Sequence, residues 1–256
     1  MRLSKTPRNI DKDLPAAGPK AYQLDGDLWV KRITLSCAIC ALLVGAADLC
    51  LVYFDLSPSK IMARSFDITR EESLCTWFSS AQALLAGLVA AAIGVHSRKH
   101  DSTFVMLGWT IVALFFIYVS LDDTAKLHER LGTTLRVKSE QITDVPLSDW
   151  FPSWGWQLFI APVFMAMGVF ILFFLWRVVA VGLRLWVLVA LGLLGFAVAL
   201  DFIEGLELEA LSSYSSTHLT QLLEEVVEML GTTTFLFIFL STLNSRIRLQ
   251  IFDSYG

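Results

Sequence analysis

Charged residues are scarce in this sequence, which narrows the class of protein. Asp, Glu, Lys and Arg make up 17% of the 256 residues, against about 25% in an ordinary soluble domain. The four cysteines lack the paired Cys-x-x-Cys spacing of a structural zinc site. The net charge is −4 and no basic stripe is present, so we expect no nucleic-acid partner.

Apolar residues are present in excess. They make up 55% of the chain, with a mean hydropathy of +0.61, which is more apolar side chain than a soluble domain of this length buries. Membrane lipids are therefore the expected partner. Six stretches approach the roughly 20 residues that a hydrocarbon core requires, at about 33–54, 73–95, 103–121, 156–176, 184–202 and 222–243. Because an unpaired backbone group in lipid is costly, they predict an all-α, polytopic transmembrane helical bundle of about six spans.

Basic residues predict how the bundle is oriented. Residues 1–28 are polar, which predicts a flexible cytoplasmic tail, and residues 29–250 are expected to form a single transmembrane domain. Most of the 20 Lys and Arg residues fall in this tail, in the links at 96–101 and 177–184, and near the C-terminus. This bias predicts a multi-pass protein whose N- and C-termini are cytoplasmic.

Acidic residues interrupt the apolar sequence near the outer ends of the predicted spans. They are Asp48, Glu72, Asp122, Asp123, Glu129, Asp201, Glu204, Glu225 and Glu228. An acidic residue at the centre of a transmembrane helix costs about 2.5–3.5 kcal/mol on insertion scales, and less near the interface. Such residues usually face the bundle interior and serve a function. We therefore predict that they converge in one cluster that faces outward.

Helical spacing favours this convergence. Glu225 and Glu228 share one face of the sixth predicted span, and Asp122 and Glu129 share a face at the end of the third. Polar faces at the same depth are expected to meet within a bundle. A competing interpretation is that the acids cap helix N-termini, where the helix dipole favours them by about 0.3–1 kcal/mol, or pair with Lys126.

Clustered carboxylates suggest a bound metal. They cannot all stay ionised in a low dielectric unless cations neutralise them. His128 adds an imidazole to an oxygen-rich set, and His218, just before the sixth predicted span, is a candidate for a second one. This combination suits a divalent metal such as Fe, Mn, Zn or Ca. The candidate metal ligands are Asp122, His128, Glu225 and Glu228. The candidate catalytic acid–base groups are Asp123 and Glu129, and the further intramembrane polar residues are Asp48, Glu72, Asp201 and Glu204.

Two of these segments resemble a known family. The run from Leu121 to Glu129 reads Leu-Asp-Asp-Thr-Ala-Lys-Leu-His-Glu, and the run from Glu224 to Gly231 reads Glu-Glu-Val-Val-Glu-Met-Leu-Gly. They are similar to paired motifs in a family of uncharacterised bacterial multi-span inner-membrane proteins, in which Glu is expected at the position of Asp123. The resemblance implies an intramembrane site and a bacterial inner membrane, but no particular reaction.

Three functions are consistent with this pattern, and the choice between enzyme and non-enzyme stays open. The first is a membrane protein that binds a divalent metal and acts on a lipid or another amphipathic substrate. The second is a proton- or cation-coupled transporter, with Asp48, Glu72, Glu204 and Glu228 as titrating groups. The third is a non-catalytic scaffold or sensor with an acidic outer cup. Gly and Ala in the spans would also allow a homo-oligomer.

Overall fold

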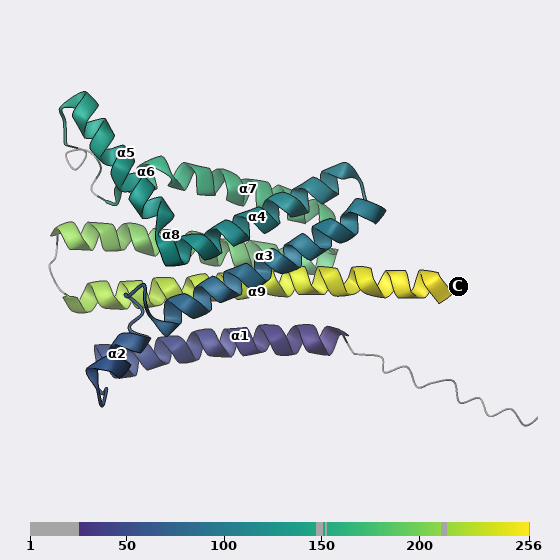
Figure 1. Cartoon of the computed structure of the whole chain (residues 1–256), viewed down its shortest axis with the longest axis horizontal. Coiled ribbons are helices and arrows are strands. Elements are labelled where there is room, and N and C mark those ends of the chain that lie inside the picture. The colour runs from purple at the N-terminus through teal and green to yellow at the C-terminus, as the bar shows by residue number, and fades with distance from the viewer. Residues whose placement is uncertain (1–25, 147–150, 152, 211–213, 256) are drawn as a thin grey trace, which may run out of the picture.

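The chain folds into a bundle of long helices (Figure 1). The computed structural model describes residues 26–146, 151, 153–210 and 214–255. Across these ranges the structure is all-α, without strands, which confirms the predicted fold class. The predicted N-terminal tail, residues 1–28, lies outside the described residues except for its C-terminal end.

Six helical segments in the described ranges are long and apolar enough to cross a membrane. They are Gly26–Tyr53, Leu74–His100, Thr103–Ala125, Ala161–Val178, Val181–Leu206 and Thr217–Arg248. They belong in turn to α1 (Gly26–Asp48) with the π-helical turn η1 (Leu49–Tyr53), α3 (Leu74–His100), α4 (Thr103–Ala125), α7 (Ala161–Val178), the 3₁₀ turn η3 (Val181–Leu183) with α8 (Arg184–Ala210), and α9 (Tyr214–Tyr255). Three shorter helices lie outside the spans: α2 (Lys60–Phe66), α5 (Leu127–Thr143) and α6 (Gly155–Phe159). The chain is thus a multi-pass membrane protein.

The fourth span begins later than the sequence predicts. The apolar stretch at 156–176 was expected to form one helix, but α6 ends at Phe159 and α7 begins at Ala161. Pro162 stands in the first turn of α7, where the missing backbone N–H is tolerated, whereas a continuous helix would need that donor. α6, the short helix before the break, buries Trp156 and Gln157.

α9 is the central helix of the bundle. It packs against α1, α3 and α8, and α3 also packs along α4. Phe235 and Phe239 of α9 are fully buried and make edge-to-face contacts with Phe116 and Trp109 of α4. The main apolar core therefore fills the middle of the bundle and the half of the bundle that contains the C-terminal part of α9.

The two ends of the bundle differ in what they contain. α1 begins and α9 ends at the same end (Figure 1). There Arg246 of α9 pairs with Asp101 of the α3–α4 link, and Ser97 also hydrogen-bonds to Arg246. Burial opposes ionisation of Asp101, but the hydrogen bonds and the charge of Arg246 outweigh it and hold the pKa of this carboxyl below its ordinary value. The helices α2, α5 and α6 lie at the opposite end, which also holds the acidic residues.

Gly132 allows α5 to pack closely on α6, and its replacement tests that contact. A Cβ at this position would overlap the backbone of Trp156. We expect Gly132→Ala to destabilise the packing of α5 on α6 by about 1–3 kcal/mol, as overpacking does elsewhere, and to speed amide hydrogen exchange in α5. Gly192→Ala is the matched control, because no atom lies within 4 Å of a Cβ there. Equal exchange in both variants would contradict close packing at Gly132.

Candidate functional site

The acidic residues gather at one end of the bundle. α1 and α4 end there, α9 begins there, and the C-terminal half of α8 lies beside α9 (Figure 1). These helix ends carry Asp48, Asp122, Asp123, Asp201, Glu204, Glu224, Glu225 and Glu228. A carboxylate cluster is therefore present, and it is divided into distinct groups of contacts.

Three carboxylates form a compact triad. Asp201 and Glu204 lie one helical turn apart on α8, and Glu224 comes from the adjoining α9. One carboxylate oxygen from each lies within 4.8 Å of the other two, which makes this group able to hold a metal ion. Among the described residues, it is the one group of three or more His, Cys, Asp or Glu side chains with this spacing.

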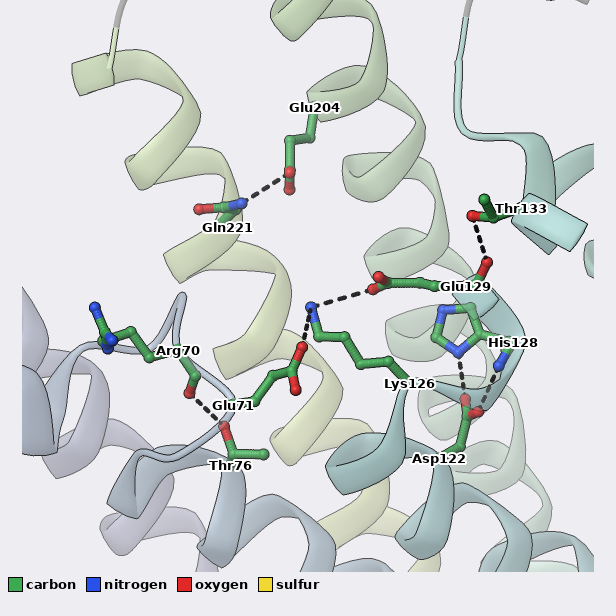
Figure 2. A network of polar contacts seen from close by, with 10 residues as sticks. All are labelled: Arg70, Glu71, Thr76, Asp122, Lys126, His128, Glu129, Thr133, Glu204 and Gln221. Atoms are coloured by element: carbon green, nitrogen blue, oxygen red, sulfur yellow. Dashed lines mark hydrogen bonds and ion pairs between the residues drawn. The ribbon is translucent and has the colours of Figure 1, made fainter. Parts of the chain in front are cut away.

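Two glutamine amides orient the triad. Gln157 of α6 donates a hydrogen bond of 2.7 Å from Nε2 to Oδ2 of Asp201. Gln221 of α9 donates one of 2.8 Å from Nε2 to Oε1 of Glu204, a contact drawn in Figure 2. Gln157 is only 8% exposed, and its Oε1 accepts no hydrogen bond from the part of the chain that the structure describes. A buried carbonyl oxygen without a donor thus accompanies the three carboxylates.

Sequence reasoning found only part of this triad. The sequence analysis names Asp201 and Glu204 as intramembrane polar residues, but it does not include Glu224 among the candidate ligands. The neighbouring Glu225 is a candidate ligand instead, although Glu224 and Glu225 lie within one helical turn of Glu228 alike. The hydropathy pattern alone cannot choose between them, since the rotation of α9 against α8 decides which glutamate reaches Asp201.

Asp122 and His128 form a separate pair, shown in Figure 2. The Oδ1 atom of Asp122 accepts a 2.8 Å hydrogen bond from the backbone N–H of His128, and Oδ2 pairs with His128 Nδ1. Burial alone would lower the pKa of His128, but the bond to Asp122 and its negative charge outweigh burial and raise that pKa. The His128 ring lies edge-on to Trp156, with 4.6 Å between the ring centroids. This pair ties the start of α5 to the end of α4.

Asp123 belongs to a third group, between α3, α4 and α9. Ser79 of α3 donates a hydrogen bond of 2.8 Å from Oγ to Oδ2 of Asp123. The charges of Glu228 and Glu225 on α9 both act on Asp123. The structure therefore associates the candidate acid–base residue Asp123 with two of the candidate metal ligands, Glu225 and Glu228.

Lys126 provides a positive charge within the cluster (Figure 2). Its Nζ lies 3.2 Å from Glu129 and 3.9 Å from Glu71, the residue that precedes Glu72. Burial alone would lower the pKa of Lys126, but the charges of Glu129 and Glu71 outweigh burial and raise it. Glu129, the second candidate acid–base group, is thus held by an ion pair.

Lys126 also has an unusual backbone. It joins α4 to α5 with φ 47° and ψ 47°, the left-handed region that non-glycine residues disfavour by roughly 1–2 kcal/mol. We expect Lys126→Gln to lower the midpoint of thermal unfolding, and Lys126→Gly to be the more stable of the two, because glycine removes the backbone penalty. Detergent-solubilised protein followed by tryptophan fluorescence would measure both. If the two midpoints were equal, strain at this junction would be refuted.

Asp48 and Glu72 lie apart from the triad, in opposite kinds of environment. Asp48 is fully buried and accepts hydrogen bonds of 2.8 Å from His218 Nε2 and 2.9 Å from the backbone N–H of Ile68. Glu72 lies in the connection before α3, where its largely exposed side chain is 3.8 Å from Arg70. His218, the second imidazole that the sequence suggests, pairs with Asp48 and is not part of the triad.

Comparison with known proteins identifies a family. No curated protein and no solved structure matches the chain. A family model does match residues 36–243, which include all six spans in whole or in part and the contacts described at the acidic end of the bundle. The chain therefore belongs to the family described as Domain of unknown function (DUF8692).

Proposed function

We propose that this membrane protein binds a divalent cation at the Asp201–Glu204–Glu224 triad. The observation that carries the proposal is the convergence of three carboxylate oxygens within 4.8 Å of one another. Ca²⁺ binds oxygen at about 2.3–2.6 Å, so two ligands on opposite sides of the ion lie about 5 Å apart. The triad would therefore need little rearrangement to hold an ion of this size.

The oxygen donors favour a hard cation. Carboxylates, amide carbonyls and water suit Ca²⁺, Mg²⁺ and Mn²⁺, whereas softer metals prefer sulfur or imidazole. Gln157 supplies a buried Oε1 without a donor beside Asp201, and a cation is one partner that would satisfy it. The two amide bonds to Asp201 and Glu204 resemble the outer-shell contacts that orient ligating carboxylates.

The surrounding charges also support a bound cation. Besides the triad, Asp123, Glu225 and Glu228 lie at the same end of the bundle. Lys126 is already shared between Glu71 and Glu129. A divalent ion would offset part of the remaining negative charge, which a low-dielectric environment makes costly.

Binding, not transport, is the activity that the rest of the bundle favours. A continuous apolar core, including Trp109, Phe116, Phe235 and Phe239, separates the acidic end from the end where α9 terminates. An ion crossing that core would find few polar partners, which argues against a cation-coupled transporter. Lys and Arg residues are concentrated at the end of the bundle where α9 terminates. This bias supports a periplasmic or outer-leaflet location for the acidic site in a bacterial inner membrane.

Chemistry on an amphipathic substrate is the second step of this proposal. Asp123 is the acid–base candidate, since it is held by Ser79 and associates with Glu225 and Glu228 beside the cation site. A site at the end of a lipid-embedded bundle is accessible to molecules with a polar headgroup and an apolar tail. Glu129 and His128 are assigned positioning roles through their bonds to Lys126 and Asp122.

Titration of the purified full chain with Mn²⁺ tests the cation site. Electron paramagnetic resonance reports free Mn²⁺ directly, so bound ion is the difference from the total. We expect one saturable site per chain, from which Ca²⁺ and Mg²⁺ displace Mn²⁺. Binding that stays linear with concentration, or displacement only by Zn²⁺, would contradict a hard oxygen site at the triad.

A further inference from the structure

α5 has an apolar face that no other part of the described chain covers. Leu127, Leu131, Leu135 and Ile142 recur at helical spacing along this 17-residue helix. Leu131 and Ile142 are 50% and 84% exposed, Leu127 is also exposed, and Leu135 is half-buried, so three of the four residues lie open. An ordinary solvated helix would present polar side chains at these positions.

The opposite face of α5 is the one that contacts the protein. Gly132 packs against Trp156 of α6, and Arg136 lies beside Gly155. Glu129 and Glu140 lie on this side too, paired with Lys126 and Arg136 respectively. The helix therefore uses its polar face for intramolecular contacts and leaves its apolar face outward, the reverse of a soluble helical bundle.

The position of α5 identifies what the apolar face meets. Residue 126 ends α4 in a left-handed conformation, and α5 leaves the span at an angle instead of extending it (Figure 1). The exposed residues Leu114 and Leu121 of α4 belong to the apolar surface of a span, and the exposed Leu127 follows Leu121 after the five residues that end α4 and form the turn. The apolar face of α5 thus begins where the lipid-facing surface of α4 ends.

Charge supports the same partner. Lys138 lies within the apolar face of α5, three residues beyond Leu135 and four before Ile142, while both acids of α5 lie on the opposite face. An exposed lysine on an apolar face extends its ammonium toward headgroup phosphates while its methylene groups remain among apolar chains. We propose that α5 is an interfacial helix whose apolar face is embedded at the headgroup–acyl boundary of the same membrane that the spans cross.

Site-directed spin labelling in lipid nanodiscs tests this proposal. The full chain, with its four cysteines replaced by alanine, would carry a nitroxide at Ile142→Cys or at Thr133→Cys. These positions are nine residues apart and therefore lie on opposite sides of α5. Both are exposed, so a label at either needs no repacking, and the shared background makes the comparison independent of the cysteine replacements.

The two labels are expected to differ in collision with relaxing agents. Oxygen, which partitions into lipid, should relax the Ile142 label at least about threefold more effectively than a water-soluble nickel complex does, and the order should reverse at Thr133. Equal access of the nickel complex to both labels would overturn the proposal, because the face would then lie in water. Dipolar broadening at Ile142 in nanodiscs with two copies of the chain, absent with one copy, would overturn it too, because a second copy would cover the face.

Discussion

Replacing His218 with alanine is expected to lower the free energy of unfolding by about 3–5 kcal/mol, because it leaves the buried Asp48 carboxylate without its side-chain partner. Asp48 is fully buried, and His218 is only 2% exposed. Without the imidazole, the Oδ2 atom of Asp48 loses its 2.8 Å contact and remains in a region with little access to water. The change separates the end of α1 from the beginning of α9, so the loss should appear as a lower midpoint of SDS-induced unfolding.

Two further variants distinguish a pair from general disruption at this position. Asp48→Asn removes the negative charge but keeps a carbonyl that accepts from Ile68 N–H, so we expect a smaller loss of about 1–2 kcal/mol. The control is His100→Ala, at an exposed histidine that ends α3 on the side of the bundle away from the acidic residues. We expect it to change the free energy of unfolding by less than about 0.5 kcal/mol. If His218→Ala were no worse than His100→Ala, the contribution of the Asp48–His218 pair would be refuted.

Loss of any one triad carboxylate should weaken Ca²⁺ and Mn²⁺ binding by about 100-fold or more. Outer-shell changes alone typically cost 10–100-fold in metal affinity, and a direct ligand contributes more. The variants are Asp201→Asn, Glu204→Gln and Glu224→Gln, which keep side-chain size and remove one charge each. Isothermal titration of the purified chain measures the dissociation constants, with equal unfolding midpoints as the check on folding.

Matched variants outside the triad make this prediction specific. Glu72→Gln removes an acid at the same end of the bundle, but its side chain is 80% exposed and lies beside Arg70, so we expect less than a threefold change in affinity. Gln157→Leu should weaken binding by about 10–100-fold, because it deletes both the bond to Asp201 and the buried Oε1. A loss of affinity as large in Glu72→Gln as in Glu224→Gln would point to diffuse electrostatics instead of a defined site.

Sequence reasoning predicted the acidic end of the bundle because burying charge in lipid is costly. Asp48, Asp123 and Glu228 each interrupt an apolar run, and such interruptions are informative without any knowledge of neighbours. The partners of these residues were harder to predict. His218 is 170 residues from Asp48 along the chain, and Gln157 is 44 residues from Asp201. No local periodicity relates residues so far apart.

The sequence by itself determined that the chain is a six-span, all-α membrane protein with acids at one end. In lipid, an apolar run of spanning length has to satisfy its own backbone hydrogen bonds, and the helix is the local structure that does so. The tertiary structure alone decided which acids meet. The rotation of α9 brings Glu224 toward Asp201, and the position of α6 places Gln157 within hydrogen-bonding distance of the same carboxylate. These contacts depend on how the side chains of different helices pack against one another. The hydropathy pattern along one helix carries no information about that packing.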